Sequence, residues 1–191
     1  MQFADFVSSG FNPIVNYLAK SHYRWNQEAD VVIRMPCGAG VNAGPFHSQT
    51  NEAWFTKTPG LKVVYPAFPY DAKGLLAEAI RQDDPVVFCE HKALYMDECE
   101  VPEGDYVIPF GKARTVVQGT DITLCGLSRM AVLAEQAAAE LAAEGISAEV
   151  IDPRTIVPLD EETLINSVKK TSRAIVIDEG HQSYGITGEI A

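Results

Sequence analysis

Two glycine-rich segments, each after a predicted strand, contain the residues best suited to chemistry. Residues 38–49 read GAGVNAGPFHSQ and include His47, and residues 178–181 read DEGH. Histidine can transfer a proton near neutral pH, and α/β proteins place active-site residues after strands. A lone histidine is more often structural, but this setting makes His47 a candidate for proton transfer. The acids Asp178 and Glu179 could act as an acid–base pair, although solvated acids are commoner at strand ends, so we assign them no role.

The glycines of residues 38–43 formally match the G-x-G-x-x-A fingerprint of dinucleotide-binding domains. That fingerprint needs a helix to begin at the glycines, whereas Gly44-Pro45 follows here and no helical period begins. We therefore interpret the segment as a turn that lets the backbone pass close to a neighbouring group. A dinucleotide-binding domain remains a third alternative. The sequence has no G-x-S-x-G, Walker A or H-E-x-x-H motif, which removes the main support for hydrolase, P-loop and metalloprotease functions.

The other histidines and the cysteines give weaker signals. His91 ends a predicted strand and His181 lies in a glycine-flanked loop, so either could reach a site, whereas His22 is most simply a surface residue. The cysteines have irregular spacing and no C-x-x-C motif, so we expect reduced, mostly buried thiols and neither a zinc site nor a disulfide framework. They are Cys37, Cys89, Cys99 and Cys125.

The composition limits the class of protein and its partners. The 191 residues are 47% hydrophobic, which is enough to bury a core, so wholesale disorder is excluded. With 15 basic and 26 acidic residues the net charge is −11, which disfavours nucleic acid and anionic membranes as partners. No apolar run is long enough to span a bilayer. The N-terminus lacks the features of a secretory signal or transit peptide, so we expect a cytoplasmic chain.

Short β-branched runs alternate with helical stretches, which predicts an α/β fold with parallel sheets. The continuous apolar character of these runs is typical of strands that are buried on both faces. The expected strands are residues 31–34, 62–65, 86–90, 122–126, 147–152 and 174–178.

Three helices are predicted from their start signals. Ser128 is expected to cap a helix that runs to Glu144 and ends at Gly145. Asp160 is expected to cap a helix that runs to about residue 170, and Asp71 one that continues through residue 80. Residues 97–119 contain three glycines and two prolines and lack a helical period, which indicates a linker. We therefore expect domains at residues 1–98 and 120–191, joined by a linker at 99–119.

Several short motifs occur in order along the chain. They are QFADF at residues 2–6, HSQ at 47–49, PGLKVV at 59–64, DAKGL at 71–75, DPVV at 84–87, DITL at 121–124, EVIDPRTI at 149–156 and DEG at 178–180. Taken together, these motifs resemble the β subunit of thiamine-diphosphate-dependent 2-oxoacid dehydrogenases of the branched-chain 2-oxoisovalerate or pyruvate type. The likeness covers essentially the whole chain. It implies the remnant of a thiamine-binding pyrimidine-type parallel-sheet domain, followed by a transketolase C-terminal-type α/β domain.

The resemblance implies the site residues and the partners. Gln2 and Phe6 match positions that line the aminopyrimidine pocket of thiamine diphosphate, and many relatives have Tyr in place of Phe6. His47 matches an active-site histidine near the substrate and the lipoyl group. A partner α subunit would hold the diphosphate and magnesium, and a lipoyl acyltransferase would accept the acyl group. The backbone of residues 79–84 matches a loop that binds a monovalent cation in some relatives, so potassium is a further expectation.

The resemblance also implies departures from the family. Family members begin before the equivalent of Gln2, and that part contains the glutamate that activates the cofactor, so we expect no turnover by the chain alone. The chain also stops before the family's closing segment.

Uncovered apolar surface favours a homo- or hetero-oligomer. The motif QFADF favours the branched-chain type over the pyruvate type, and acetoin dehydrogenase β subunits remain an alternative. A non-catalytic interaction module that keeps the subunit-contact domain is the second hypothesis.

Overall fold

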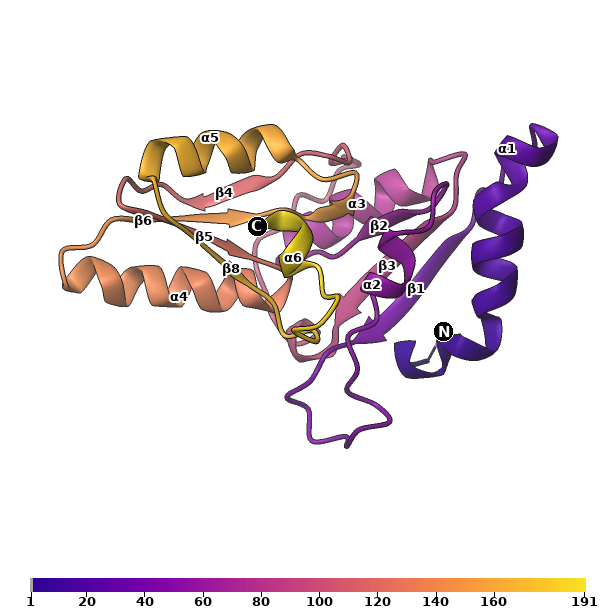
Figure 1. Ribbon diagram of the computed structural model, residues 1–191, viewed down its shortest axis with the longest axis horizontal. Helices are drawn as coiled ribbons and strands as arrows, with labels where there is room; N and C mark the ends of the chain where they lie inside the picture. Colours follow the sequence, from indigo (N-terminus) through magenta and orange to yellow (C-terminus); the bar gives the residue numbers. More distant parts are fainter. Residues whose placement is uncertain (1) are drawn as a thin grey trace.

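Two four-stranded sheets form the framework of the protein. The computed structural model describes residues 2–191 and places the sheets side by side along the long axis of the molecule (Figure 1). The first sheet has the order β1-β3-β2-β7 and the second the order β4-β6-β5-β8. The strands are β1 (Val32–Cys37), β2 (Lys62–Val64), β3 (Val86–His91), β4 (Arg114–Val117), β5 (Ile122–Gly126), β6 (Ala148–Asp152), β7 (Thr155–Val157) and β8 (Ala174–Ile177).

The predicted α/β fold with parallel-rich sheets is confirmed. Strand β3 pairs in parallel with both β1 and β2, and β5 pairs in parallel with both β6 and β8. Every residue of β3 and β6 is buried, as expected for strands covered on both faces. Strand β8 differs, since it is an edge strand and Ile175 is half exposed.

Two strands were not predicted from the sequence, and both are antiparallel. Strand β4 lies within the segment 99–119, interpreted above as a linker, and pairs with β6. Strand β7 follows β6 in the chain but pairs with β2, so that it adds to the edge of the first sheet. The chain therefore crosses from the second sheet back to the first, which ties the two sheets together.

Helices cover the second sheet on both faces, with α4 (Arg129–Ala143) on one side and α5 (Glu161–Thr171) on the other (Figure 1). In the first part of the chain, α3 (Pro69–Ile80) packs near β3, and a series of short helical turns packs along the β1 side. The turns of this series are η1 (Ala4–Gly10), η2 (Pro13–Tyr17), η3 (Leu18–Lys20) and α1 (Ser21–Trp25). Three other short helices come later in the chain, namely α2 (Ala53–Thr56), η4 (Lys92–Leu94) and α6 (Thr187–Ile190).

The predicted helix starts are partly right. The Asp160 side chain accepts a hydrogen bond from the Thr163 N–H at 3.1 Å, which confirms that cap. The prediction that Ser128 caps α4 is wrong, because its hydroxyl donates to the Pro66 carbonyl at 2.9 Å and so holds the start of α4 against the first sheet's loop. The Asp71 cap is also wrong. The helix already begins at Pro69, whose fixed φ suits the first turn, and Asp71 is turned into the interior toward arginines.

The largest apolar core lies between the first sheet and the N-terminal turns. Its members are fully or almost fully buried and include Val7, Met35, Phe55, Val63 and Val87. Three cysteines are buried and one, Cys99, is exposed, and all are free thiols, as predicted. Within residues 2–191, no helix combines the length and the apolar character needed to cross a membrane.

Candidate active site

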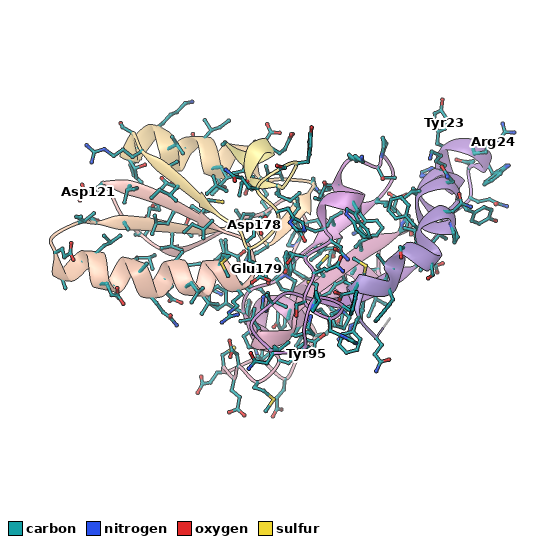
Figure 2. All side chains as sticks on the ribbon, turned by 60° about the horizontal axis from the view of Figure 1, so that its bottom comes forward. Tyr23, Arg24, Tyr95, Asp121, Asp178 and Glu179 are labelled. Atoms are coloured by element: carbon teal, nitrogen blue, oxygen red, sulfur yellow. The ribbon has the colours of Figure 1, made fainter. Side chains whose placement is uncertain are left out.

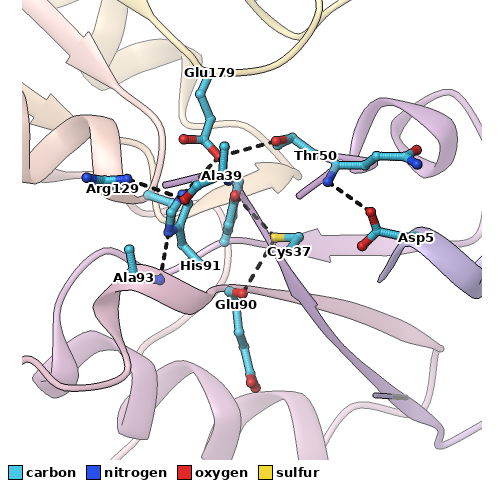
Figure 3. Close-up of polar contacts among 12 residues, drawn as sticks. Asp5, Cys37, Ala39, Thr50, Glu90, His91, Ala93, Arg129 and Glu179 are labelled. Carbon is cyan, nitrogen blue, oxygen red and sulfur yellow. Dashed lines mark hydrogen bonds and ion pairs between the residues drawn. The ribbon is translucent and has the colours of Figure 1, made fainter. Parts of the chain in front are cut away.

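The loop between β1 and α2 carries His47. The two ends of this loop are joined by a hydrogen bond from the Gly38 N–H to the Gln49 carbonyl at 3.0 Å. At its tip, the His47 N–H donates to the Gly44 carbonyl at 3.2 Å, which forms a tight turn. The Gln49 N–H also donates to the buried Asp5 carboxylate at 3.0 Å (Figure 3). The loop is thereby tied to the N-terminal segment that contains the QFADF motif.

An aromatic cluster forms where this loop meets the N-terminal segment. The ring centroid of His47 lies 4.6 Å from that of Phe3 and 5.6 Å from that of Phe6, and both contacts are edge-to-face. Phe6 is 52% exposed, so one face of the cluster is open. The structure therefore brings His47 and Phe6 together. Gln2 lies at the exposed start of the same segment, next to Phe3.

A second polar group lies behind the loop, at the carboxyl ends of β3 and β8. The His91 Nε2 atom is 2.8 Å from the Glu179 Oε1 atom, and the His91 side chain is almost completely buried (Figure 3). His91 Nδ1 accepts a hydrogen bond from the Ala93 N–H at 3.2 Å. We therefore assign the ring proton to Nε2, which donates to the carboxylate. Burial opposes ionisation of Glu179, but the hydrogen bonds from His91 and the Ala39 N–H lower its pKa below the ordinary value.

Two further carboxyl groups, those of Glu52 and Asp178, lie near Glu179. Glu52, at the start of α2, is buried, and this burial together with the neighbouring Asp178 raises its pKa to about 8. Burial also raises the pKa of Asp178, which lies beside Glu179 at the junction of the two sheets (Figure 2). Within residues 2–191, the Glu52 Oε2 and Asp178 Oδ1 atoms are buried without a hydrogen-bond partner. Burial therefore favours the protonated form of both acids, and Glu52, with a pKa of about 8, can retain its proton at neutral pH.

The glycine-rich turn lets the backbone of the loop lie directly against the side chains of His91 and Arg129. A Cβ atom at Gly38 would lie 2.3 Å from the His91 ring, and one at Gly40 would lie 2.3 Å from Nη1 of Arg129. No helix begins at either glycine. The interpretation as a turn of close approach is confirmed, and the helix on which the dinucleotide-binding alternative depended is absent from this described segment.

Substitution of Gly38 by alanine is expected to lower the free energy of unfolding by about 2 kcal/mol, because it adds a steric clash to a left-handed backbone. Gly44→Ala is the matched control, since Gly44 also has a positive φ but has no atom within 4 Å of the added Cβ. It should cost about 1 kcal/mol. Urea unfolding of both variants measures the difference, and equal losses would contradict the close packing on His91.

The sequence signals for His91 and Glu179 were incomplete. His91 ends β3 and Glu179 follows β8, and either could have been placed near a site, but nothing in the sequence shows that β3 and β8 end at the same place in space. Among residues 2–191, no group of three or more His, Cys, Asp or Glu side chains is arranged to hold a metal ion.

Comparison with known families agrees with this architecture. The family model described as "Transketolase, pyrimidine binding domain" matches residues 1–98, and that described as "Transketolase, C-terminal domain" matches residues 111–191. Among solved structures, a split-gene transketolase described as an inactive β4 tetramer superposes with a TM-score of 0.80 at 25% identity. That likeness covers 99% of this chain and 60% of the other.

Curated relatives match along the whole chain. The β subunit of acetoin:2,6-dichlorophenolindophenol oxidoreductase from Cupriavidus necator is 48% identical over 100% of this chain. The 2-oxoisovalerate dehydrogenase β subunit of Bacillus subtilis is 45% identical, and the pyruvate dehydrogenase E1 component β subunit of Acholeplasma laidlawii is 46% identical, each again over 100% of this chain. The chain spans only 57% of the first relative and 59% of the other two.

The two matched domains, their order in the chain and the whole-length similarity lead to one conclusion. The chain belongs to the transketolase pyrimidine-binding-domain family, with a transketolase C-terminal domain after it, and its relatives are the β subunits of 2-oxoacid and acetoin dehydrogenases.

Proposed function

We propose that this chain supplies the β-subunit side of a thiamine diphosphate site in a 2-oxoacid dehydrogenase. The observation that carries the proposal is the open aromatic cluster of Phe3, Phe6 and His47 within the pyrimidine-binding domain. The exposed Phe6 offers an apolar surface to a flat heteroaromatic ring, so the residues present fit an aminopyrimidine. When bound, thiamine diphosphate supplies a nucleophilic carbon and an electron sink for decarboxylation of a 2-oxo acid.

In this proposal each residue has a separate task. Phe6 forms an aromatic wall of the pocket, and Gln2, exposed at the start of the same segment, contributes a polar side chain to its rim. Phe3 supports the His47 ring through its edge contact at 4.6 Å. His47 donates or accepts a proton beside the substrate, which an imidazole can do near neutral pH.

The partners belong to the same proposal. An α subunit would hold the diphosphate and magnesium, and a lipoyl acyltransferase would take the acyl group. Potassium would use backbone carbonyls of residues 79–84, although two of these already accept hydrogen bonds, Ala79 from Gln82 at 3.3 Å and Asp83 from Ala29 at 2.9 Å. The split-gene transketolase is described as a tetramer of β subunits, which supports an oligomer of this chain as well.

The substrate class is proposed as a branched-chain 2-oxo acid or pyruvate. Acetoin is the second candidate, since an acetoin oxidoreductase β subunit is as similar as the dehydrogenase subunits. Comparing the binding of 2-oxoisovalerate, pyruvate and acetoin to the chain assembled with an α subunit from each relative separates the two candidates, because binding does not need the activating glutamate. Binding of acetoin alone would reject the 2-oxoacid assignment.

Phe6→Ala is expected to weaken thiamine diphosphate binding about tenfold, because an exposed aromatic wall contributes on the order of 1 kcal/mol or more to ring stacking. Calorimetric titration of the cofactor with magnesium measures this for the chain alone and for the chain mixed with an α subunit. Binding is expected only in the mixture. Phe46→Ala is the matched control, since Phe46 is exposed beside His47 in sequence and should leave affinity unchanged.

Two outcomes of the titration would reject this function. Absence of binding in the mixture, with the α subunit still attached to the chain, would favour the alternative of a non-catalytic interaction module. Equal affinities for the wild type, Phe6→Ala and His47→Ala would show that the cofactor binds elsewhere.

A further inference from the structure

We infer that Glu179 and Arg129 are positioning residues that clamp the loop carrying His47. Both come from the C-terminal part of the chain, Glu179 just after β8 and Arg129 at the first residue of α4. They hold the same residue, Ala39, through the N–H and the carbonyl of the two peptide groups that flank its Cα atom. The Ala39 N–H donates to Glu179 Oε1 at 2.9 Å, and the Ala39 carbonyl accepts from Arg129 Nη1 at 3.4 Å (Figure 3).

The same carboxylate oxygen reaches the other end of the loop. The Thr50 hydroxyl donates to Glu179 Oε1 at 3.3 Å, and His91 Nε2 donates to it at 2.8 Å. Ala39 and Thr50 stand at the two ends of the segment that contains His47, so one oxygen atom fixes both ends. His91 in turn fixes Glu179 to the end of β3.

Burial makes these contacts strong. The side chains of His91 and Glu179 are 1% and 16% exposed, so their hydrogen bonds are largely shielded from water. Gly38 and Gly40 are required for the approach, since a Cβ at either position would strike the His91 ring or the Arg129 guanidinium. The turn and the clamp therefore depend on each other.

Between its clamped ends, the loop is supported by hydrogen bonds within itself, such as that from the Ser48 hydroxyl to the Gly44 carbonyl at 2.8 Å. Residues 40–46 are exposed, and His47 is held by a local turn and by the two phenylalanine rings. A displacement of the Ala39 end would shift His47 relative to Phe6. The C-terminal domain thus sets the geometry of a site built by the pyrimidine-binding domain. As a role in catalysis, this rests on the proposed function of His47.

Hydrogen–deuterium exchange of the whole chain tests the clamp without any ligand. Glu179→Ala should accelerate exchange in peptides that cover residues 38–50 about tenfold or more, because it removes several hydrogen bonds to a charged group. Glu179→Gln should give a smaller increase, since the amide oxygen can still accept from the Ala39 N–H. Arg129→Met, at a partly exposed position, is a second variant that leaves the buried His91–Glu179 contact in place. It should accelerate the same peptides.

Glu140→Ala, at an exposed position on α4, is the matched control and should leave these peptides unchanged. Unchanged exchange of residues 38–50 in both Glu179→Ala and Arg129→Met would overturn the clamp, as would a uniform increase along the whole chain. The result is independent of the cofactor. A loosened loop together with a failed thiamine diphosphate titration would reject the proposed function and leave the clamp standing.

Discussion

Replacement of Asp71 by alanine is expected to lower the free energy of unfolding by about 3 to 5 kcal/mol, because it leaves buried positive charge without its partner. The Asp71 carboxylate is completely buried and lies 2.9 Å from Arg114 Nη1 and 2.7 Å from Arg154 Nη2. Arg154 is 14% exposed, and Arg114 also lies over the Phe68 ring. The three charges join α3 to β4 and to the turn between β6 and β7.

The matched control for Asp71 is an ion pair at the surface. Asp105→Ala removes the partner of Arg81 in a pair at 2.5 Å, but both side chains are more than half exposed. Its loss should cost at most about 1 kcal/mol, since water already screens the charges. Denaturant unfolding followed by circular dichroism measures both variants. Similar small losses for the two would mean that Asp71 does not hold the halves of the protein together.

Glu52→Gln is expected to abolish a pH-dependent loss of stability on the order of 5 kcal/mol. Burial and the neighbouring Asp178 raise the pKa of Glu52 to about 8, whereas the unfolded chain has the ordinary value near 4.5. Between these two values the folded state binds more protons than the unfolded state. The free energy of unfolding therefore falls as the pH rises from about 4.5 to 8. Above pH 8, the ionisation of Glu52 changes it no further.

The measurement is the free energy of unfolding at pH 5 and at pH 8.5 for the wild type and the variant. Glutamine keeps the shape of the protonated acid but cannot ionise, so Glu52→Gln should lose less stability over this range than the wild type. Glu140→Gln, an exposed acid on α4, controls for the change in net charge. Parallel pH dependences of the wild type and Glu52→Gln would show that Glu52 does not hold a proton in the fold.

Much of the fold could be predicted because local pattern and tertiary role agree. Continuous apolar runs gave the buried parallel strands such as β3, and Asp160 caps its helix as its position before two glutamates indicated. The failures occur where tertiary contacts prevail over local preference. Asp71 and Ser128 have good capping side chains, yet one pairs with two arginines and the other bonds to a distant carbonyl. The short strands β4 and β7 depend on pairing with β6 and β2 more than on their own sequence.

The candidate site was predictable in part for the same reason. The approach of His47 to Phe6 follows from motifs within one domain, so the family resemblance could indicate it. The contact between His91 and Glu179 depends on two strand ends in different sheets, and no spacing along the chain reports it. The close approach at Gly38 was predictable from backbone chemistry, but the group that it approaches was not.

If Phe3, Phe6 and His47 form one wall of a thiamine diphosphate pocket, the cofactor must bind next to the His47 ring. NMR of the chain with 13C-labelled histidine, assembled with an α subunit, follows this ring as thiamine diphosphate and magnesium are added. We expect the His47 ring signal to shift with cofactor occupancy, while the signal of His22, on the exposed helix α1, does not. Cofactor binding to the assembly with an unchanged His47 signal would show that these residues do not line the pocket.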